Sequence, residues 1–140
     1  MPVKHYNAWQ FNHPDFDRLK GNFGLTCNHE GKVSLVADKM AVRQSIFLLL
    51  STIPGERIRR PDYGCNLYQL TFMPNDPTTH GLAIHYVRQA LERWEPRIII
   101  HKIDAYRSAS DMISKIDISL EYEIKTLEMN DEFVLTMTLM

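Results

Sequence analysis

A single proline in the motif Trp94-Glu95-Pro96-Arg97-Ile98 constrains this sequence more than any other residue. Proline has no backbone N–H and disfavours helical geometry in the residue before it, so a helix that reaches this motif ends near Trp94. The apolar run Ile98-Ile99-Ile100 follows at once and is typical of a buried strand. We therefore expect a helix and a strand to meet here with almost no loop between them.

Glu95 occupies an electrostatically unfavourable position in this motif. The C-terminal end of a helix carries partial negative charge, which favours a cation over a carboxylate. Glu95 and Arg97 are either a solvated pair of charges, which would contribute little to stability, or a specific ion pair. Residues that break a local rule often mark functional or specifically paired positions. Both interpretations remain open from the residues alone.

The sequence after this motif predicts a three-stranded antiparallel meander. Its first strand runs from Ile98 to Tyr106, and its last strand alternates from Phe133 to Leu139 after a turn at residues 129–132. The middle strand alternates most clearly, because polar residues separate its apolar members: Ile116, Ile118, Leu120, Tyr122 and Ile124. Such alternation indicates a strand with one buried and one solvated face.

Two helices precede the meander in the prediction. The first runs from its predicted N-cap Asp38 to about Ser51, and the second follows the N-cap pair Asp76-Pro77. The second has one apolar face, formed by Leu82, Ala83, Tyr86, Val87, Ala90, Leu91 and Trp94. Proline and glycine frame the charged residues 56–64, which we predict to be an ordered loop. Two main helices packed on a three-stranded meander make an α+β domain.

The first 37 residues show no comparable period. A polar and aromatic leader extends to about Lys20, and its residues Trp9, Phe11 and Phe16 could pack on this chain or on a partner. A short hairpin is expected around His29-Glu30-Gly31. We therefore divide the chain into an N-terminal arm, residues 1–37, and a single domain, residues 38–140.

Composition excludes several functional classes. The formal net charge of -1 gives no broad basic field, so we expect no nucleic-acid partner. Cys27 and Cys65 are too few for a secreted disulfide framework and indicate reduced thiols in a protein made in the cytosol. The longest apolar run, Ile46 to Leu50, is far shorter than the ~20 residues that span a bilayer. No membrane segment and no secretory signal are expected.

The sequence indicates neither a metal site nor a cofactor. The candidate metal ligands lack the closely spaced pairs that structural zinc requires; they are Cys27, His29, His80, His85 and His101. Four carboxylates could supply the acid pair of a glycosidase, namely Glu56, Asp62, Glu92 and Glu95. Arginines flank each of them, and a neighbouring arginine lowers a carboxyl pKa and favours an ion pair. No motif in the sequence supports catalysis.

Four motifs occur in one order: Gln44-Ser45-Ile46, then Leu50 to Arg57 (LSTIPGER), then Pro61 to Gly64 (PDYG), then Ala90 to Ile98 (ALERWEPRI). This order resembles the GpW or gene-twenty-five-like family of baseplate wedge proteins, which occurs in myophage tails, type VI secretion baseplates and extracellular contractile injection particles. The match extends from about Asp38 to the C-terminus.

The resemblance implies a small structural wedge subunit. The family also bears a lysozyme label, but we expect no enzymatic activity, because the carboxylates in the matching motifs lie next to arginines. Six copies would surround the baseplate and contact the first ring of sheath protein. Other wedge subunits would be partners, and tube or hub proteins are further candidates. The matching motifs place partner-binding residues at Pro54, Gly55, Glu56, Arg57, Pro61, Gly64, Glu95, Pro96 and Arg97. The subunit would be assembled in the cytoplasm into a virion tail or contractile particle.

A meander that ends the chain suggests how sheath assembly could begin. Its last strand leaves unpaired backbone groups at an edge, and Thr136 and Thr138 bring no charge to protect it. An extended arm of the sheath protein could add to such an edge through backbone hydrogen bonds. Two alternatives remain: a tail-associated peptidoglycan hydrolase, and an α+β binding module unrelated to contractile tails.

Overall fold

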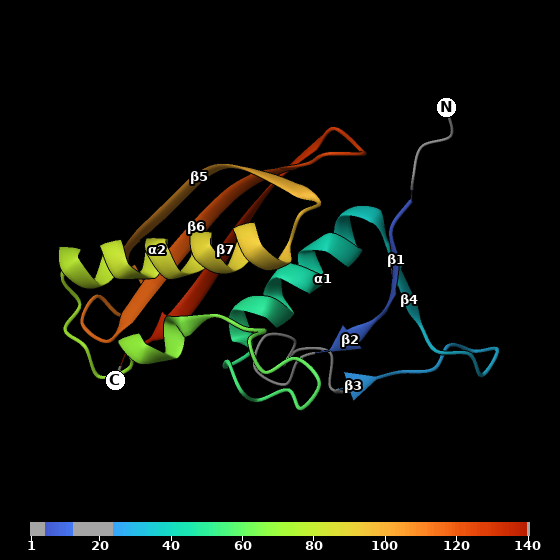
Figure 1. Ribbon diagram of the computed structural model, residues 1–140, viewed down its shortest axis with the longest axis horizontal. Helices are drawn as coiled ribbons and strands as arrows, with labels where there is room; N and C mark the ends of the chain where they lie inside the picture. The colour runs from blue at the N-terminus through green and yellow to red at the C-terminus, as the bar shows by residue number, and fades with distance from the viewer. Residues whose placement is uncertain (1–4, 13–23, 140) are drawn as a thin grey trace.

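The computed structural model describes residues 5–12 and 24–139. In chain order its elements are β1 (Asn7–Trp9), β2 (Phe11–Asn12), β3 (Gly24–Leu25), β4 (Leu35–Ala37), α1 (Asp38–Ser51), the 3-10 helix η2 (Asn66–Leu70), α2 (Pro77–Trp94), β5 (Ile98–Arg107), β6 (Lys115–Ile124) and β7 (Met129–Thr138). Helices α1 and α2 lie on one face of the β5–β6–β7 sheet (Figure 1). The predicted α+β fold is confirmed. Over the described residues, no helix has the length and apolar character needed to cross a bilayer.

The sheet follows the predicted meander. Both neighbouring strand pairs are antiparallel, and β6 lies in the middle. The five apolar residues of β6 are buried beneath the helices, whereas Asp117, Ser119, Glu121 and Glu123 alternate with them on the opposite face. Strand β5 contains an irregularity between Ile100 and Lys102, where its register with β6 shifts.

Helix α2 begins and ends where the sequence predicts. The Asp76 carboxylate accepts the Thr79 backbone N–H at 2.8 Å and caps the first turn. The last helical residue is Trp94, and the Glu95 N–H still donates to the Leu91 carbonyl at 2.9 Å. Strand β5 then begins at Ile98, as the proline requires.

The predicted N-cap of α1 is wrong. Ala37 occupies the cap position, and Asp38 is already the first helical residue, with a positive φ of 50°. The Asp38 carboxylate instead accepts the Tyr6 N–H at 3.0 Å and contacts the His5 ring at 3.0 Å. Asp38 therefore joins the helix to the N-terminal segment. A partner more than thirty residues away in sequence gives no local signal.

The predicted turn at residues 129–132 is also wrong. These four residues belong to β7, and the turn consists of Lys125 to Glu128, with Glu128 at a positive φ of 48°. Asn130 and Asp131 look like turn residues in sequence. Here they pair across the sheet with Glu123 and Tyr122. Their tertiary partners outweigh their local preference for turns.

The N-terminal segment forms two short ribbons. Strand β1 pairs with β4, and β2 pairs with β3, both antiparallel. The predicted hairpin turn is present, since the Asn28 N–H donates to the Lys32 carbonyl at 2.7 Å. Trp9 stays 62% exposed, so its ring is available rather than packed. Phe11 is half-buried, and Phe16 lies outside the described residues.

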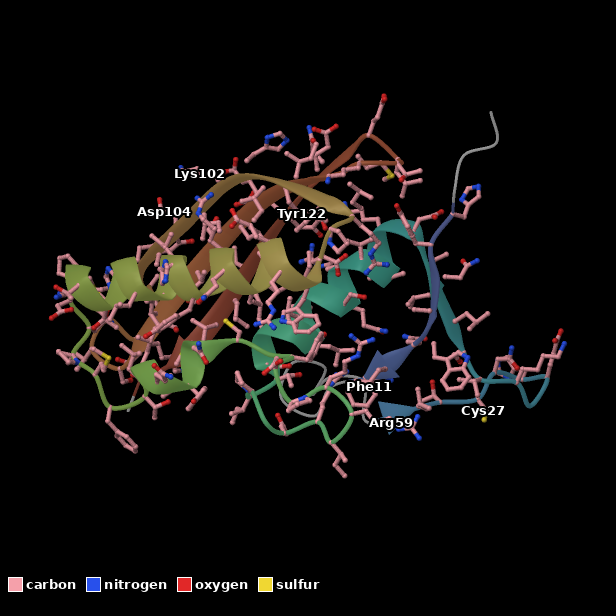
Figure 2. All side chains as sticks on the ribbon, in the orientation of Figure 1. Phe11, Cys27, Arg59, Lys102, Asp104 and Tyr122 are labelled. Atoms are coloured by element: carbon pink, nitrogen blue, oxygen red, sulfur yellow. The ribbon has the colours of Figure 1, made fainter. Side chains whose placement is uncertain are left out.

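A buried carboxylate joins α1 to the sheet. The Asp131 side chain is 6% exposed and accepts from the Tyr122 hydroxyl at 2.7 Å (Tyr122 is labelled in Figure 2). Lys39 Nζ and Arg43 Nη1, both from α1, each lie 3.1 Å from its oxygens. Burial acts to raise the pKa of Asp131, but the hydrogen bonds and both cations outweigh it and lower the pKa. Burial also raises the pKa of Tyr122, and the bond to Asp131 adds to the increase.

Replacing Asp131 with asparagine should destabilise this junction. We expect Asp131→Asn to lower the free energy of unfolding at pH 7 by about 2–3 kcal/mol, because two cations lose their counter-charge. A carboxylate with a lowered folded-state pKa stabilises the fold above its unfolded pKa of about 3.9, and this contribution disappears as the pH falls through the folded value. The difference from the parent protein should therefore shrink below about pH 4.

Urea denaturation between pH 7 and pH 3 would measure both effects. Asp104→Asn is the matched control, because the Asp104 side chain is 52% exposed and should change stability little. Equal losses in the two variants would contradict a special role for Asp131.

Candidate docking site at the helix-to-strand junction

Glu95 and Arg97 form a two-point ion pair at the junction of α2 and β5. Arg97 Nε donates to Glu95 Oε1 at 2.6 Å, and Arg97 Nη2 donates to Glu95 Oε2 at 2.9 Å. The Glu95 side chain is 5% exposed and that of Arg97 is 29% exposed. The hydrogen bond to Glu95 is the main reason that the pKa of Arg97 rises. Of the two interpretations left open by the sequence, the structure therefore shows the specific pair.

The loop between α1 and η2 is ordered, as predicted. The Gly55 N–H donates to the Pro61 carbonyl at 2.7 Å and closes the loop on itself. The Glu56 carboxylate accepts the Ile53 N–H at 2.9 Å and so satisfies a backbone donor just after the end of α1. These bonds hold residues 55–61 in one compact turn.

Gly64 fixes where this loop meets α1. Its φ is +142°, and a Cβ atom at this position would lie 2.5 Å from the Thr52 carbonyl oxygen and 2.9 Å from the Pro54 nitrogen. Both neighbours are backbone atoms, so neither can move aside cheaply. Only glycine fits here. The adjacent Cys65 N–H then donates to the same Thr52 oxygen at 2.9 Å.

Aromatic rings connect the loop to the helix-to-strand junction. The Arg57 guanidinium lies 4.4 Å from the centre of the Tyr63 ring, and the Tyr63 ring meets the Trp94 ring edge-on at 5.3 Å. Burial raises the pKa of Tyr63, which stays a neutral phenol at ordinary pH. Two motifs about forty residues apart thus form one continuous surface.

The N-terminal segment reaches the same surface. The Tyr6 ring lies 5.1 Å from the Arg97 guanidinium carbon, and its hydroxyl bonds to Thr126 Oγ1 at 2.7 Å. Sequence reasoning missed Tyr6, Tyr63 and Trp94 as site residues. For Tyr63 and Trp94 a signal existed, since both lie within the matching motifs; Tyr6 gave none.

A shallow groove runs between the loop and the C-terminal half of α2. Pro61, Asp62 and Gly64 line one side, and Gln89 and Arg93 line the other. Asp62 and Arg93 face each other across it at 3.6 Å, and both are largely exposed.

The Cys65 thiol also lines this groove. Burial raises its pKa to about 11, so it stays protonated and is not a nucleophile.

The predicted site residues differ in exposure: two are buried, and the others are half-buried or exposed. Gly55, Glu56, Arg57, Pro61 and Pro96 are exposed, and Pro54 and Arg97 are half-buried. Glu95 and Gly64 are buried. Glu95 and Gly64 support the surface from beneath. The other seven residues form its accessible part, which we call the junction surface.

The candidate catalytic and metal residues are not assembled into a centre. Over residues 5–12 and 24–139, no group of three or more His, Cys, Asp or Glu side chains could hold a metal ion. Three of the four carboxylates considered for a glycosidase have partners: Glu56 binds the Ile53 N–H, Asp62 faces Arg93, and Glu95 binds Arg97. Glu92 is exposed on α2.

Comparison with known families identifies the chain. The family model described as baseplate wedge protein gp25 matches residues 36–128. The chain belongs to this family. The match spans α1, the ordered loop, α2, β5 and β6, and so includes the whole junction surface. It ends before β7, whereas the sequence resemblance extends to the C-terminus. A search of curated proteins gave no significant match.

Solved structures share the fold of this chain. A candidate tail lysozyme from Geobacter sulfurreducens is 30% identical, with a TM-score of 0.67 over 73% of this chain and 91% of that one. A subunit of the anti-feeding prophage baseplate is 19% identical, with a TM-score of 0.64 over 97% of this chain and 87% of that one. The type VI secretion baseplate gives 18% identity and a TM-score of 0.53 over 72% of this chain and 93% of that one. The last two show the shared fold.

Removing Arg97 should destabilise the junction. We expect Arg97→Ala to lower the free energy of unfolding by about 2–3 kcal/mol, because the buried Glu95 carboxylate is left without its partner. The double variant Glu95→Leu/Arg97→Leu should recover most of the loss, since it removes both charges. Urea denaturation measures these changes.

Arg93→Ala is the control for that experiment. Arg93 is 59% exposed and faces the exposed Asp62, so its loss should cost less than about 1 kcal/mol. If the double variant were as unstable as Arg97→Ala, an unpaired buried charge would not be the cause.

Proposed function

We propose that this chain is a wedge subunit that docks on other wedge proteins through the junction surface and starts sheath assembly by β-strand addition. The observation that carries the proposal is the uncharged second half of β7, from Val134 to Thr138, on a domain of the baseplate wedge family. Docking and strand addition would use different features of the domain. Docking would use the junction surface, and strand addition would use the unpaired backbone groups of β7.

The junction surface has the features of a docking site. Arg57 and Pro96 are exposed, and Arg57 lies over the half-buried Tyr63 ring. Arginine and aromatic residues are enriched at protein interfaces. The Glu95–Arg97 pair and Gly64 hold this surface in one shape before any partner arrives. A preorganised surface loses little conformational entropy on binding.

The two edges of the sheet differ, and β7 is the better acceptor. On β5 the register shift near Ile100 and the charges of Lys102 and Asp104 (both labelled in Figure 2) oppose strand pairing. Strand β7 pairs regularly with β6 along its whole length. Val134, Thr136 and Thr138 are exposed and uncharged, and of the strands that the structure describes none pairs with the outer edge of β7.

Helix α1 limits the accepting region to the second half of β7. Arg43 donates to the Glu132 carbonyl at 3.0 Å, so a side chain of α1 covers the start of the strand. The stretch from Val134 to Thr138 is left for an extended arm of the sheath protein. Alternate side chains of that arm would then meet the two faces of this sheet.

A structurally similar baseplate subunit suggests how many copies of this chain a baseplate would contain. The anti-feeding prophage baseplate was determined with six-fold symmetry. We extend this to the present chain and propose six copies per baseplate, with sheath and wedge proteins as partners and tube or hub proteins as further contacts.

A peptidoglycan hydrolase is the second candidate, because one similar structure is described as a candidate tail lysozyme. We favour a non-catalytic role. Both oxygens of Glu95 accept hydrogen bonds from Arg97, and the Glu56 carboxylate accepts the Ile53 N–H just after α1. Neither carboxylate is therefore placed to act as a general acid. Peptidoglycan turnover by the purified protein, abolished by Glu56→Gln or Glu95→Gln, would overturn this choice.

Charges on the β7 edge should block sheath assembly. We expect Thr136→Lys/Thr138→Lys to reduce the number of sheathed particles at least about tenfold, equivalent to about 1.4 kcal/mol of strand-addition free energy, because edge lysines oppose strand pairing. Both side chains are exposed, so the unfolding temperature should stay nearly unchanged. Electron microscopy of assembled particles gives the count.

The control places two lysines on the opposite edge. His101→Lys/Tyr106→Lys changes exposed residues of β5 and should leave sheath numbers unchanged. Loss of sheath only in this β5 variant would mean that the other edge accepts the arm. Normal sheath on baseplates that lack the protein altogether would refute the initiator role.

A further inference from the structure

The loop between α1 and η2 presents one aliphatic side chain entirely to solvent. Ile58 is 99% exposed, more than any other large apolar residue that the structure describes. A single exposed apolar residue is common on protein surfaces and means little alone. The structure of the loop around Ile58 distinguishes it from an ordinary exposed apolar residue.

The loop holds Ile58 in place rather than letting it move. The Gly55–Pro61 hydrogen bond closes the loop on both sides of the tip. The Arg60 N–H donates to the Arg57 carbonyl at 3.3 Å, so the residues around Ile58 form a tight turn. The Arg57 side chain packs on the Tyr63 ring and anchors the turn to the junction surface. An anchor residue fixed in this way binds with little loss of entropy.

Positive charge surrounds this tip. Arg59 (labelled in Figure 2) and Arg60 are exposed and form no ion pair with any residue in the described parts of the chain. The two acids closest in sequence have other partners: Glu56 accepts the Ile53 N–H, and Asp62 faces Arg93. The tip therefore combines an apolar end with uncompensated cations, although the whole chain has a formal net charge of -1.

We propose that Ile58 inserts into an apolar pocket on another wedge subunit, and that carboxylates at the rim of that pocket pair with Arg59 and Arg60. This inference rests on the proposed function, since it takes the partner from the same baseplate. Complementary charge would orient the two proteins, and burial of Ile58 would supply affinity. A nucleic acid fits less well, because phosphates would pair with the arginines and leave the aliphatic tip in water.

The affinity of the wedge complex tests the apolar part. Wedge proteins isolated from baseplates that contain this chain would be purified together and titrated with the full-length protein. Ile58→Ser should weaken binding about 10- to 100-fold, the effect of losing one buried aliphatic side chain. Ile113→Ser is the matched control, because Ile113 is 74% exposed in the turn between β5 and β6 and should bind as the parent does.

A charge reversal tests the rim. Arg59→Glu/Arg60→Glu should weaken binding at least about tenfold, with the greatest loss at low salt, where exposed charges are least screened. Lys102→Glu/Lys125→Glu changes the net charge equally at exposed positions elsewhere and should bind normally. A photo-crosslinker in place of Ile58 should attach to a wedge peptide that contains Asp or Glu.

The outcomes separate this inference from the proposed function. If the parent protein binds the wedge proteins but Ile58→Ser and Arg59→Glu/Arg60→Glu bind equally well, the tip is not the anchor, and docking through the junction surface stands. If the parent protein binds none of them, both proposals fail. Competition by duplex DNA that is lost in Arg59→Glu/Arg60→Glu would assign the tip to nucleic acid and overturn the inference.

Discussion

The pairing of Glu95 with Arg97 is the interaction on which the arrangement of this domain depends. Helix α2 ends at Trp94 and β5 begins at Ile98, so the chain changes from helix to strand at the negative end of the helix. A carboxylate there would be unfavourable without a partner. Arg97 provides two hydrogen bonds to it, and its guanidinium also lies beside Tyr6. Helix, strand and N-terminal segment thus meet around one buried charge.

Much of the fold could be predicted because its signals are local. Alternation along β6 and the capping by Asp76 both lie within a few residues of the elements that they define. The two errors have the opposite origin. Asp38 binds Tyr6 rather than its own helix, and Asp131 binds α1 and stays in a strand despite its preference for turns. Acidic side chains with distant partners therefore gave misleading local signals.

The candidate site was predictable in outline and not in detail. The order of the motifs indicated the loop and the junction, and the family match covers both. The motifs include Tyr63 and Trp94, but they do not show that these rings connect the loop to the junction, because stacking between Arg57, Tyr63 and Trp94 depends on how the loop closes. Nor does the sequence show that Glu95 is buried and Ile58 exposed, since exposure depends on the complete fold.

The uncharged edge of β7 also has a cost for the free subunit. An edge recognises backbone rather than a particular sequence, so it offers the same hydrogen bonds to a second copy of this chain as to a partner. In the proposed strand addition, capture by a growing baseplate increases in proportion to the concentration of free subunit, whereas pairing between two copies increases with its square. The proposed assembly is therefore favoured when the subunit is made slowly and used at once. On this proposal, the amount of protein synthesised helps to decide which strand the edge receives.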